Sequence, residues 1–121
     1  MTYRLRVTEL FAMRVVCNVA LQGGTESLIS DELHRVLVPE DFSSLVYRQV
    51  WRAICAVRAT GRVVTPAAVV AHLDIVNPGL FGDWVKALSH DEDVAHSLAE
   101  TGVLEFAREL LRHTELRRAA A

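Results

Sequence analysis

Residues 43–61 read SSLVYRQVWRAICAVRATG and form the longest periodic segment of the chain. Four aliphatic residues recur in it at spacings of four, four and three: Val46, Val50, Ile54 and Val57. This periodicity places them on one face of an α-helix, which Tyr47, Trp51 and Cys55 flank. The apolar stripe is wide enough for a central helix that contacts several others. Ser43 or Ser44 is the expected N-cap, and Gly61 the expected stop.

The segment before it predicts two further helices. Thr8 is the expected N-cap of the first, which has a broad apolar stripe and runs to about Gln22. Gly23 and Gly24 end this helix, and a second helix is expected over about residues 26–36. Pro39 breaks the pattern that follows.

The segment after residue 61 predicts shorter helices with short connections. Thr65 and Pro66 mark a helix start, because a hydroxyl cap precedes a proline at the first helical position. Asn77–Gly79 predicts a turn. Further helices are expected over residues 80–88, 90–100 and about 103–119. Because no long strand-like alternation interrupts these patterns, the sequence predicts a single all-α domain over residues 1–121.

Composition narrows the class of protein. Of 121 residues, 51% are hydrophobic and 23% are charged, which excludes intrinsic disorder. No apolar run approaches the roughly 18 residues of a membrane span, and no signal peptide is visible, so the sequence predicts a soluble cytoplasmic protein. The net charge of −2 disfavours nucleic acid as the main ligand. Arg48, Arg52 and Arg58 could contact phosphates, but the acidic total favours a solvated face.

Catalytic motifs are absent from the sequence. It contains no G-x-x-x-x-G-K-[ST], G-x-G-x-x-G, H-E-x-x-H or G-x-S-x-G, so we expect no enzyme activity, catalytic residue or cofactor in this chain alone. One cluster, His90–Asp93 with His96, has metal-like content. Acidic side chains at the start of a helix are stabilised by the positive end of the helix dipole, which explains this cluster without a metal. Because no second cluster supplies further ligands, we expect no metal site. Cys17 and Cys55 are expected as small buried hydrophobes rather than a disulfide or a reactive thiol.

The last predicted helix has paired charges. Glu105, Arg108, Glu109 and Arg112 form opposite-charge pairs at i, i+3, either as a solvated face or as a docking face for a partner helix. Three isolated histidines are expected at the surface or half-buried, without a special role: His34, His72 and His113. Four aromatic residues are expected in the core: Trp51, Phe81, Trp84 and Phe106.

Several short motifs together resemble a known family. Residues 37–42 (LVPEDF) are similar to the "L-x-P-E-D-F" turn in the N-terminal domain of DnaB-type replicative helicases. In the family's order follow Tyr47, Val50–Ile54 and Gly61, and then Val64–Pro66 with Val69 and Leu73. Val103–Arg108 and Glu115–Arg118 resemble its "N-V-x-x-Y-A-R … L-R-R" helix, with Gly102 in place of the usual Asn. Glu9 fits the opening of the first helix, so the resemblance covers about residues 8–118.

The resemblance implies a compact orthogonal bundle of about six helices over residues 8–100, followed by a helix over about 102–119 that begins a hairpin. In that family such domains pair through their hairpins into a collar on a hexameric ring, and the collar binds primase. The implied partners are therefore primase, other helicase subunits or a second copy of the domain, with a helicase loader as a further candidate. The candidate interface residues lie on the last helix: Phe106, Arg108, Glu109, Arg112, Glu115 and Arg117.

Other functions remain open at this stage. The sequence ends at Ala121 without the second hairpin helix or the family's ATPase motor, so we expect either a fragment of a helicase or a stand-alone homologue. A stand-alone homologue could be an adaptor or inhibitor that mimics the collar. The chain could also be the helicase-binding domain of a primase, although the Pro39–Phe42 turn favours the helicase side. A helix-turn-helix DNA-binding domain is the alternative outside this family.

Overall fold

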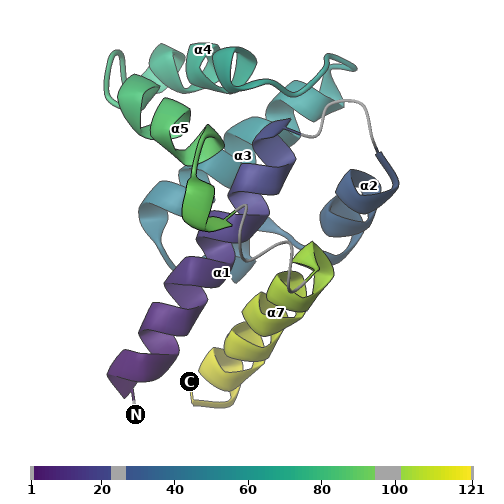
Figure 1. Cartoon of the computed structure of the whole chain (residues 1–121), viewed down its shortest axis with the longest axis vertical. Helices are drawn as coiled ribbons and strands as arrows, with labels where there is room; N and C mark the ends of the chain where they lie inside the picture. Colours follow the sequence, from purple (N-terminus) through teal and green to yellow (C-terminus); the bar gives the residue numbers. More distant parts are fainter. Residues whose placement is uncertain (1, 23–26, 95–101, 121) are drawn as a thin grey trace.

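The computed structural model describes the backbone of residues 2–22, 27–94 and 102–120, and the side chains of residues 9–22, 31–94 and 102–120. Its elements are α1 (Thr2–Gln22), α2 (Ser27–Val36), the 3₁₀ turn η1 (Pro39–Asp41), α3 (Leu45–Ala59), α4 (Pro66–Val76), α5 (Gly82–Ser89) and α7 (Val103–Ala120). Residues 92–94 are also helical, whereas the rest of the helix expected over 90–100 lies outside the described residues. The described ranges contain helices and no strand, which confirms the all-α fold (Figure 1).

Helix α1 is central to the fold. It packs against α3, α5 and α7, with smaller contacts to α2 and α4 (Figure 1). Of the apolar stripe that the sequence predicts, Val15, Val16 and Ala20 are buried, Phe11 and Val19 are partly buried, and Leu10 is exposed. The other buried apolar side chains of α1 are Ala12, Met13, Cys17 and Leu21. The predicted N-cap was wrong, because α1 begins at Thr2 and Thr8 lies inside it. Residues 2–7 contain neither glycine nor proline, so nothing in them stops the helix from continuing toward the N-terminus.

Helix α3 supplies much of the core that faces α1. Val50, Trp51, Ala53, Ile54 and Val57 are buried, in agreement with the predicted stripe, whereas Val46 is exposed. Ser44 is the N-cap residue, although its side chain makes no capping hydrogen bond. Gly61 has a φ of 79°, a left-handed conformation that favours glycine, and it follows the end of the helix as predicted.

Helices α4 and α5 form a second layer across one end of α1 and α3 (Figure 1). The predicted start of α4 is confirmed, since Thr65 Oγ1 accepts a hydrogen bond of 3.1 Å from the Ala68 amide. The expected start of α5 at Leu80 was wrong, because α5 begins at Gly82. Asp74 accepts a hydrogen bond from the Gly79 amide, and this turn leaves Leu80 exposed before the helix starts.

Helix α7 belongs to the same hydrophobic core as the other helices. It lies alongside α1, and it also contacts α2 and η1 (Figure 1). Val103, Ala107 and Leu110 are buried against the rest of the core. None of the described helices is both long and apolar enough to cross a membrane. The face of α7 opposite its buried residues is exposed and carries candidate interface residues.

Candidate functional site

The exposed face of α7 carries the charge pairs that the sequence predicts. Arg108 forms an ion pair with Glu105, and Arg112 forms one with Glu109, each at i, i+3. Pairs of this kind contribute about 0.2–0.5 kcal/mol each to helix stability. The hydrogen bond from Arg112 holds the pKa of Glu109 below its ordinary value, so this carboxylate is charged at neutral pH.

The six candidate interface residues differ in how far they take part in the packing of α7. Arg108, Arg112 and Glu115 are exposed on the outside of α7. Phe106 is half-buried and packs edge-to-face on Phe11 of α1, with ring centroids 5.8 Å apart. Arg117 is partly exposed, but its guanidinium turns toward the rest of the fold, where it binds α1 and η1. Glu109 is half-buried beside His113.

A buried polar cluster joins α7 to the turn η1. Asp41 is buried, and its two carboxylate oxygens have different partners. One accepts a hydrogen bond of 2.9 Å from the Val38 amide, and the other accepts one of 2.8 Å from the Thr114 hydroxyl. Arg117 donates to the backbone carbonyl of Asp41 at 3.3 Å. The acid therefore stabilises the turn and also fixes α7 against it.

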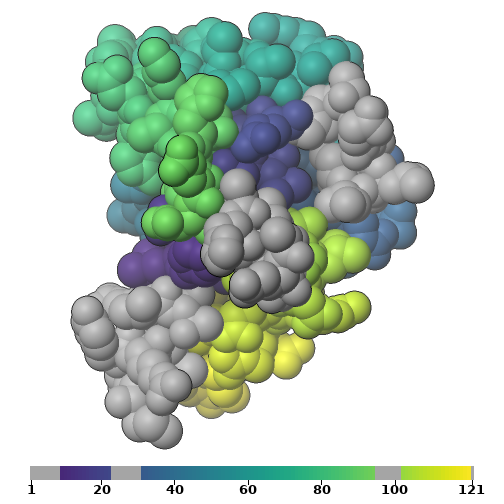
Figure 2. Space-filling model, viewed as in Figure 1, coloured from purple at the N-terminus to yellow at the C-terminus, as the bar shows by residue number. Residues whose placement is uncertain are grey.

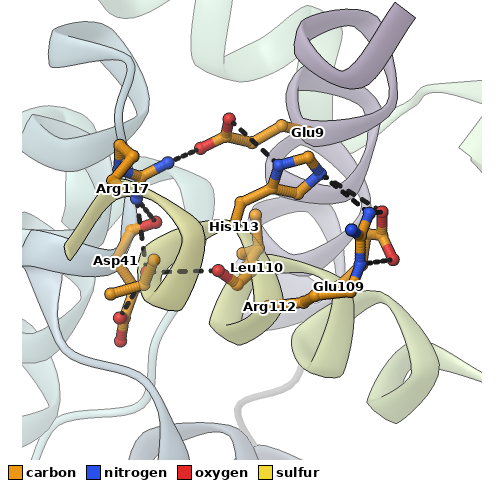
Figure 3. Close-up of polar contacts among 8 residues, drawn as sticks. Glu9, Asp41, Glu109, Leu110, Arg112, His113 and Arg117 are labelled. Atoms are coloured by element: carbon orange, nitrogen blue, oxygen red, sulfur yellow. Dashed lines mark hydrogen bonds and ion pairs between the residues drawn. The ribbon is translucent and has the colours of Figure 1, made fainter. Parts of the chain in front are cut away.

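The cluster continues to α1 through Glu9 and His113 (Figure 3). Glu9 is buried and forms an ion pair with Arg117. The His113 side chain is 5% exposed, and it lies 3.7 Å from Glu9 and 3.2 Å from Glu109. The sequence predicted His113 at the surface or half-buried, which was wrong, because the packing of α7 on α1 buries it. We name Glu9, Asp41, His113, Thr114 and Arg117 the α1–α7 clasp.

An arginine of the chain itself binds acidic side chains of the cluster with metal-like content, residues 90–93. Arg14 of α1 donates two hydrogen bonds to the carboxylate of Asp91, and it also contacts Asp93 at 3.4 Å. These hydrogen bonds hold the pKa of Asp91 below its ordinary value. Within the described parts of the chain, no group of three or more His, Cys, Asp or Glu side chains could hold a metal ion. His96 lies outside the described residues.

Two amides of α1 bind the end of α5. Asn18, which is buried, donates a hydrogen bond of 2.7 Å to the Leu88 carbonyl. Gln22 donates to the Ser89 carbonyl at 3.0 Å and to the Asn18 side chain at 3.1 Å. These bonds satisfy carbonyls that a helix C-terminus leaves without intrahelical partners. The side chains of Asn18 and Gln22 therefore orient α5 on α1.

An aromatic stack lies between α2, η1 and α3. The His34 ring stacks on Trp51 at 4.7 Å, and Trp51 stacks on Phe42 at 5.0 Å. Burial, and then the charge of Arg58, lowers the pKa of His34 to about 4, so its ring is neutral at pH 7. Cys55 Sγ lies 3.7 Å from His34 Nδ1, and burial raises the pKa of both Cys55 and Cys17. Cys17 is buried as predicted, whereas Cys55 is only half-buried. The raised pKa values fit an apolar role for both thiols.

The arginine series of α3 does not form a single cationic face. Arg48 donates a hydrogen bond of 2.9 Å to the Phe42 carbonyl, and Arg58 forms an ion pair with Asp31 of α2. Arg52 lies 3.8 Å from Glu40. The three side chains therefore bind different neighbours. This arrangement favours a structural role over a phosphate-binding series.

The clasp could not be found from helical periodicity. Glu9, Asp41 and Arg117 are far apart in the sequence, and a pattern reports only neighbours within one element. The motifs that resemble DnaB-type domains include all three positions, but they do not predict that these side chains contact one another. Comparisons with known proteins add no assignment, because no family model, curated protein or solved structure matches the chain.

Proposed function

We propose that this chain is a non-catalytic protein-interaction and oligomerisation domain of the replicative DNA helicase system, similar to the N-terminal domain of DnaB-type helicases. Its proposed partners are primase and other copies of the domain or helicase subunits. One observation carries the proposal: three motif segments that are far apart in sequence meet in the α1–α7 clasp through Glu9, Asp41 and Arg117. Short motifs in a common order are weak support, whereas motifs whose residues also bind one another support a shared architecture.

The outer face of α7 is the proposed docking surface. Arg108, Arg112 and Glu115 are exposed there, next to the partly exposed Leu116. Their two acidic neighbours, Glu105 and Glu109, are held by i, i+3 ion pairs, so the face presents an ordered pattern of both signs. Complementary charges of this kind orient a partner and speed its association. The clasp on the opposite side fixes the rotation of α7 and hence the direction of this face.

Capture of purified primase by the chain tests this function. The test variant is the double substitution Arg108→Glu with Arg112→Glu. Its matched control is Arg35→Glu with Lys86→Glu, which changes the net charge equally but on α2 and α5 instead of on α7. We expect the test variant to lose at least about tenfold in affinity for primase, and the control to lose less than about twofold. Light scattering of the chain alone and with primase gives the stoichiometry.

Each result has a clear consequence. Equal losses in both double variants would remove the α7 face from the proposal. Binding to a purified helicase hexamer but not to primase would replace the proposed role with that of an adaptor or inhibitor. The absence of binding to primase, to the hexamer and to a second copy would overturn the proposed function.

A further inference from the structure

Helix α4 exposes an apolar surface that no described element covers. Its inward side chains, Val69 and Leu73, are buried, but Ile75 is 78% exposed and Val76 is 77% exposed. Figure 2 shows α4 in teal along the upper edge of the molecule. A helix with apolar side chains on several faces is typically covered on more than one of them. An apolar patch that is left open commonly marks a site of protein interaction.

Two shallow hollows lie beside this surface, where α4 crosses α3. The first, of about 260 Å³, extends from Arg52 to Val76. The second, of about 240 Å³, extends from Arg62 to Ile75. His72 lines both hollows, so they adjoin along α4. We name this surface the α3–α4 groove.

Small side chains from both helices are among those that line the groove. Ala53 and Ala56 of α3 line it from one side, and Ala68 and Ala71 of α4 line it from the other. Small residues leave room for the backbone and apolar side chains of a docked helix to come close. Helix-in-groove recognition uses this geometry, with anchors at i, i+3 or i+4 and i+7.

The charged groups of the groove all carry the same sign. Arg52 borders the first hollow and Arg62 the second, and both are exposed. The described residues that line the two hollows include no aspartate or glutamate. Outside the lining, Arg52 lies 3.8 Å from Glu40, at the outer limit of an exposed ion pair. The hollow between α4 and α5 differs, since Asp74 and Lys86 line it together.

We propose that the α3–α4 groove binds an amphipathic helix of a partner protein with acidic residues beside its apolar face. The apolar anchors pack on Ile75 and Val76, and the acidic side chains pair with Arg52 and Arg62. A nucleic acid is a poorer fit, because the two arginines flank exposed aliphatic side chains, whereas a phosphate-binding surface is a continuous basic patch. This site is separate from the α7 face and does not depend on the function proposed for that face.

The test uses a defined probe and the isotope-labelled whole chain. The probe is a synthetic helical peptide of about 18 residues, with leucines at helical spacing and glutamates on both flanks. A second peptide with lysine for every glutamate is the matched control, and a short DNA duplex is a third ligand. At low salt we expect the acidic peptide to bind at least about tenfold more tightly than the basic peptide. Its amide shifts should map to Ala56, Ala71 and His72.

Variants test the charged part and the apolar part of the groove separately. Arg52→Glu with Arg62→Glu should abolish or invert the preference for the acidic peptide, whereas Arg35→Glu with Lys86→Glu should preserve it. Ile75→Ser with Val76→Ser, which adds no charge, should weaken both peptides at least about tenfold, and exposure of these side chains means that the fold should survive. Circular dichroism checks the fold of each variant.

Four outcomes would overturn this proposal. They are equal affinity for the two peptides, no binding of the acidic peptide, shifts that map to α7 instead of α3 and α4, and tighter binding of the duplex than of the acidic peptide. Because primase is not used, failure here leaves the proposed function of the α7 face untouched.

Discussion

Arg117 of α7 forms an ion pair with Glu9 of α1, across 108 positions of sequence. The same guanidinium donates to the backbone carbonyl of Asp41 in η1. One side chain therefore connects the first helix, the 3₁₀ turn and the last helix. Because Glu9 is buried, the pair is shielded from solvent on one side and should be stronger than the exposed pairs of α7.

A double-mutant cycle of Glu9→Gln and Arg117→Gln tests the strength of this pair. We expect a coupling free energy of about 1 kcal/mol in urea unfolding. The reference cycle uses Glu32→Gln and Arg35→Gln, an exposed i, i+3 pair of α2, for which we expect about 0.3 kcal/mol. Equal coupling in the two cycles would show that burial of Glu9 adds nothing.

Removal of the Asp41 carboxylate should destabilise the fold strongly. Asp41→Ala leaves the Val38 amide and the buried Thr114 hydroxyl without this acceptor. We expect the free energy of unfolding to fall by about 3 kcal/mol, measured by urea denaturation. The neighbouring substitution Glu40→Ala is the control, with an expected change within about 0.5 kcal/mol, because Glu40 is exposed. Similar losses in both variants would contradict the role given to Asp41.

The cap of α4 should depend on the Thr65 hydroxyl. Thr65→Ala removes the acceptor of the Ala68 amide, and we expect a loss of about 1 kcal/mol in unfolding free energy. Thr65→Ser keeps a hydroxyl at the same position and should retain most of the stability. A Ser variant as unstable as the Ala variant would indicate that the methyl group, and not the hydrogen bond, matters.

The stability of the fold should depend on pH through His34. Its pKa is lowered to about 4 in the folded state, whereas an unfolded histidine titrates near about 6.5. Between these two values the unfolded chain binds more protons than the folded one, so stability should fall as pH decreases from about 6.5 to about 4. Nuclear magnetic resonance titration of the His34 ring should give a midpoint near pH 4.

Replacement of this ring supplies the control. His34→Phe keeps an aromatic ring beside Trp51 but cannot take up a proton. The dependence of unfolding free energy on pH should be shallower in this variant between about pH 6.5 and about pH 4.5. An unchanged dependence, or an ordinary midpoint for the His34 ring in the intact chain, would contradict the role given to its burial.

Helical periodicity and caps allowed much of the fold to be predicted. The stripe of α3, the cap at Thr65 and the stop at Gly61 depend on nearby residues, and all three are found in the structure. The start of α1 was missed because Thr8 is a good capping residue that the structure does not use as one. Intrinsic preference for a cap is a weak signal where the preceding residues also favour a helix.

The buried polar groups were harder to predict. His113 was expected at the surface or half-buried, but packing of α7 against α1 buries it between Glu9 and Glu109. Asn18 and Gln22 are polar positions of α1 whose partners are carbonyls at the end of α5. Each depends on contacts between distant segments, and no local pattern in one sequence records such contacts. The charge pairs of α7 were predictable because both partners lie on one helix.

The pairing of α1 with α7 also settles where the backbone termini emerge. Both ends lie at the same pole of the molecule, while α4 and α5 occupy the opposite pole (Figure 1). A short flexible linker could therefore join the two ends, and new ends could be opened at the exposed Pro78–Gly79 turn. Such a circular permutant would rearrange the connectivity and keep the same core, and any tag fused to either end of this 121-residue chain would stand clear of the α3–α4 groove.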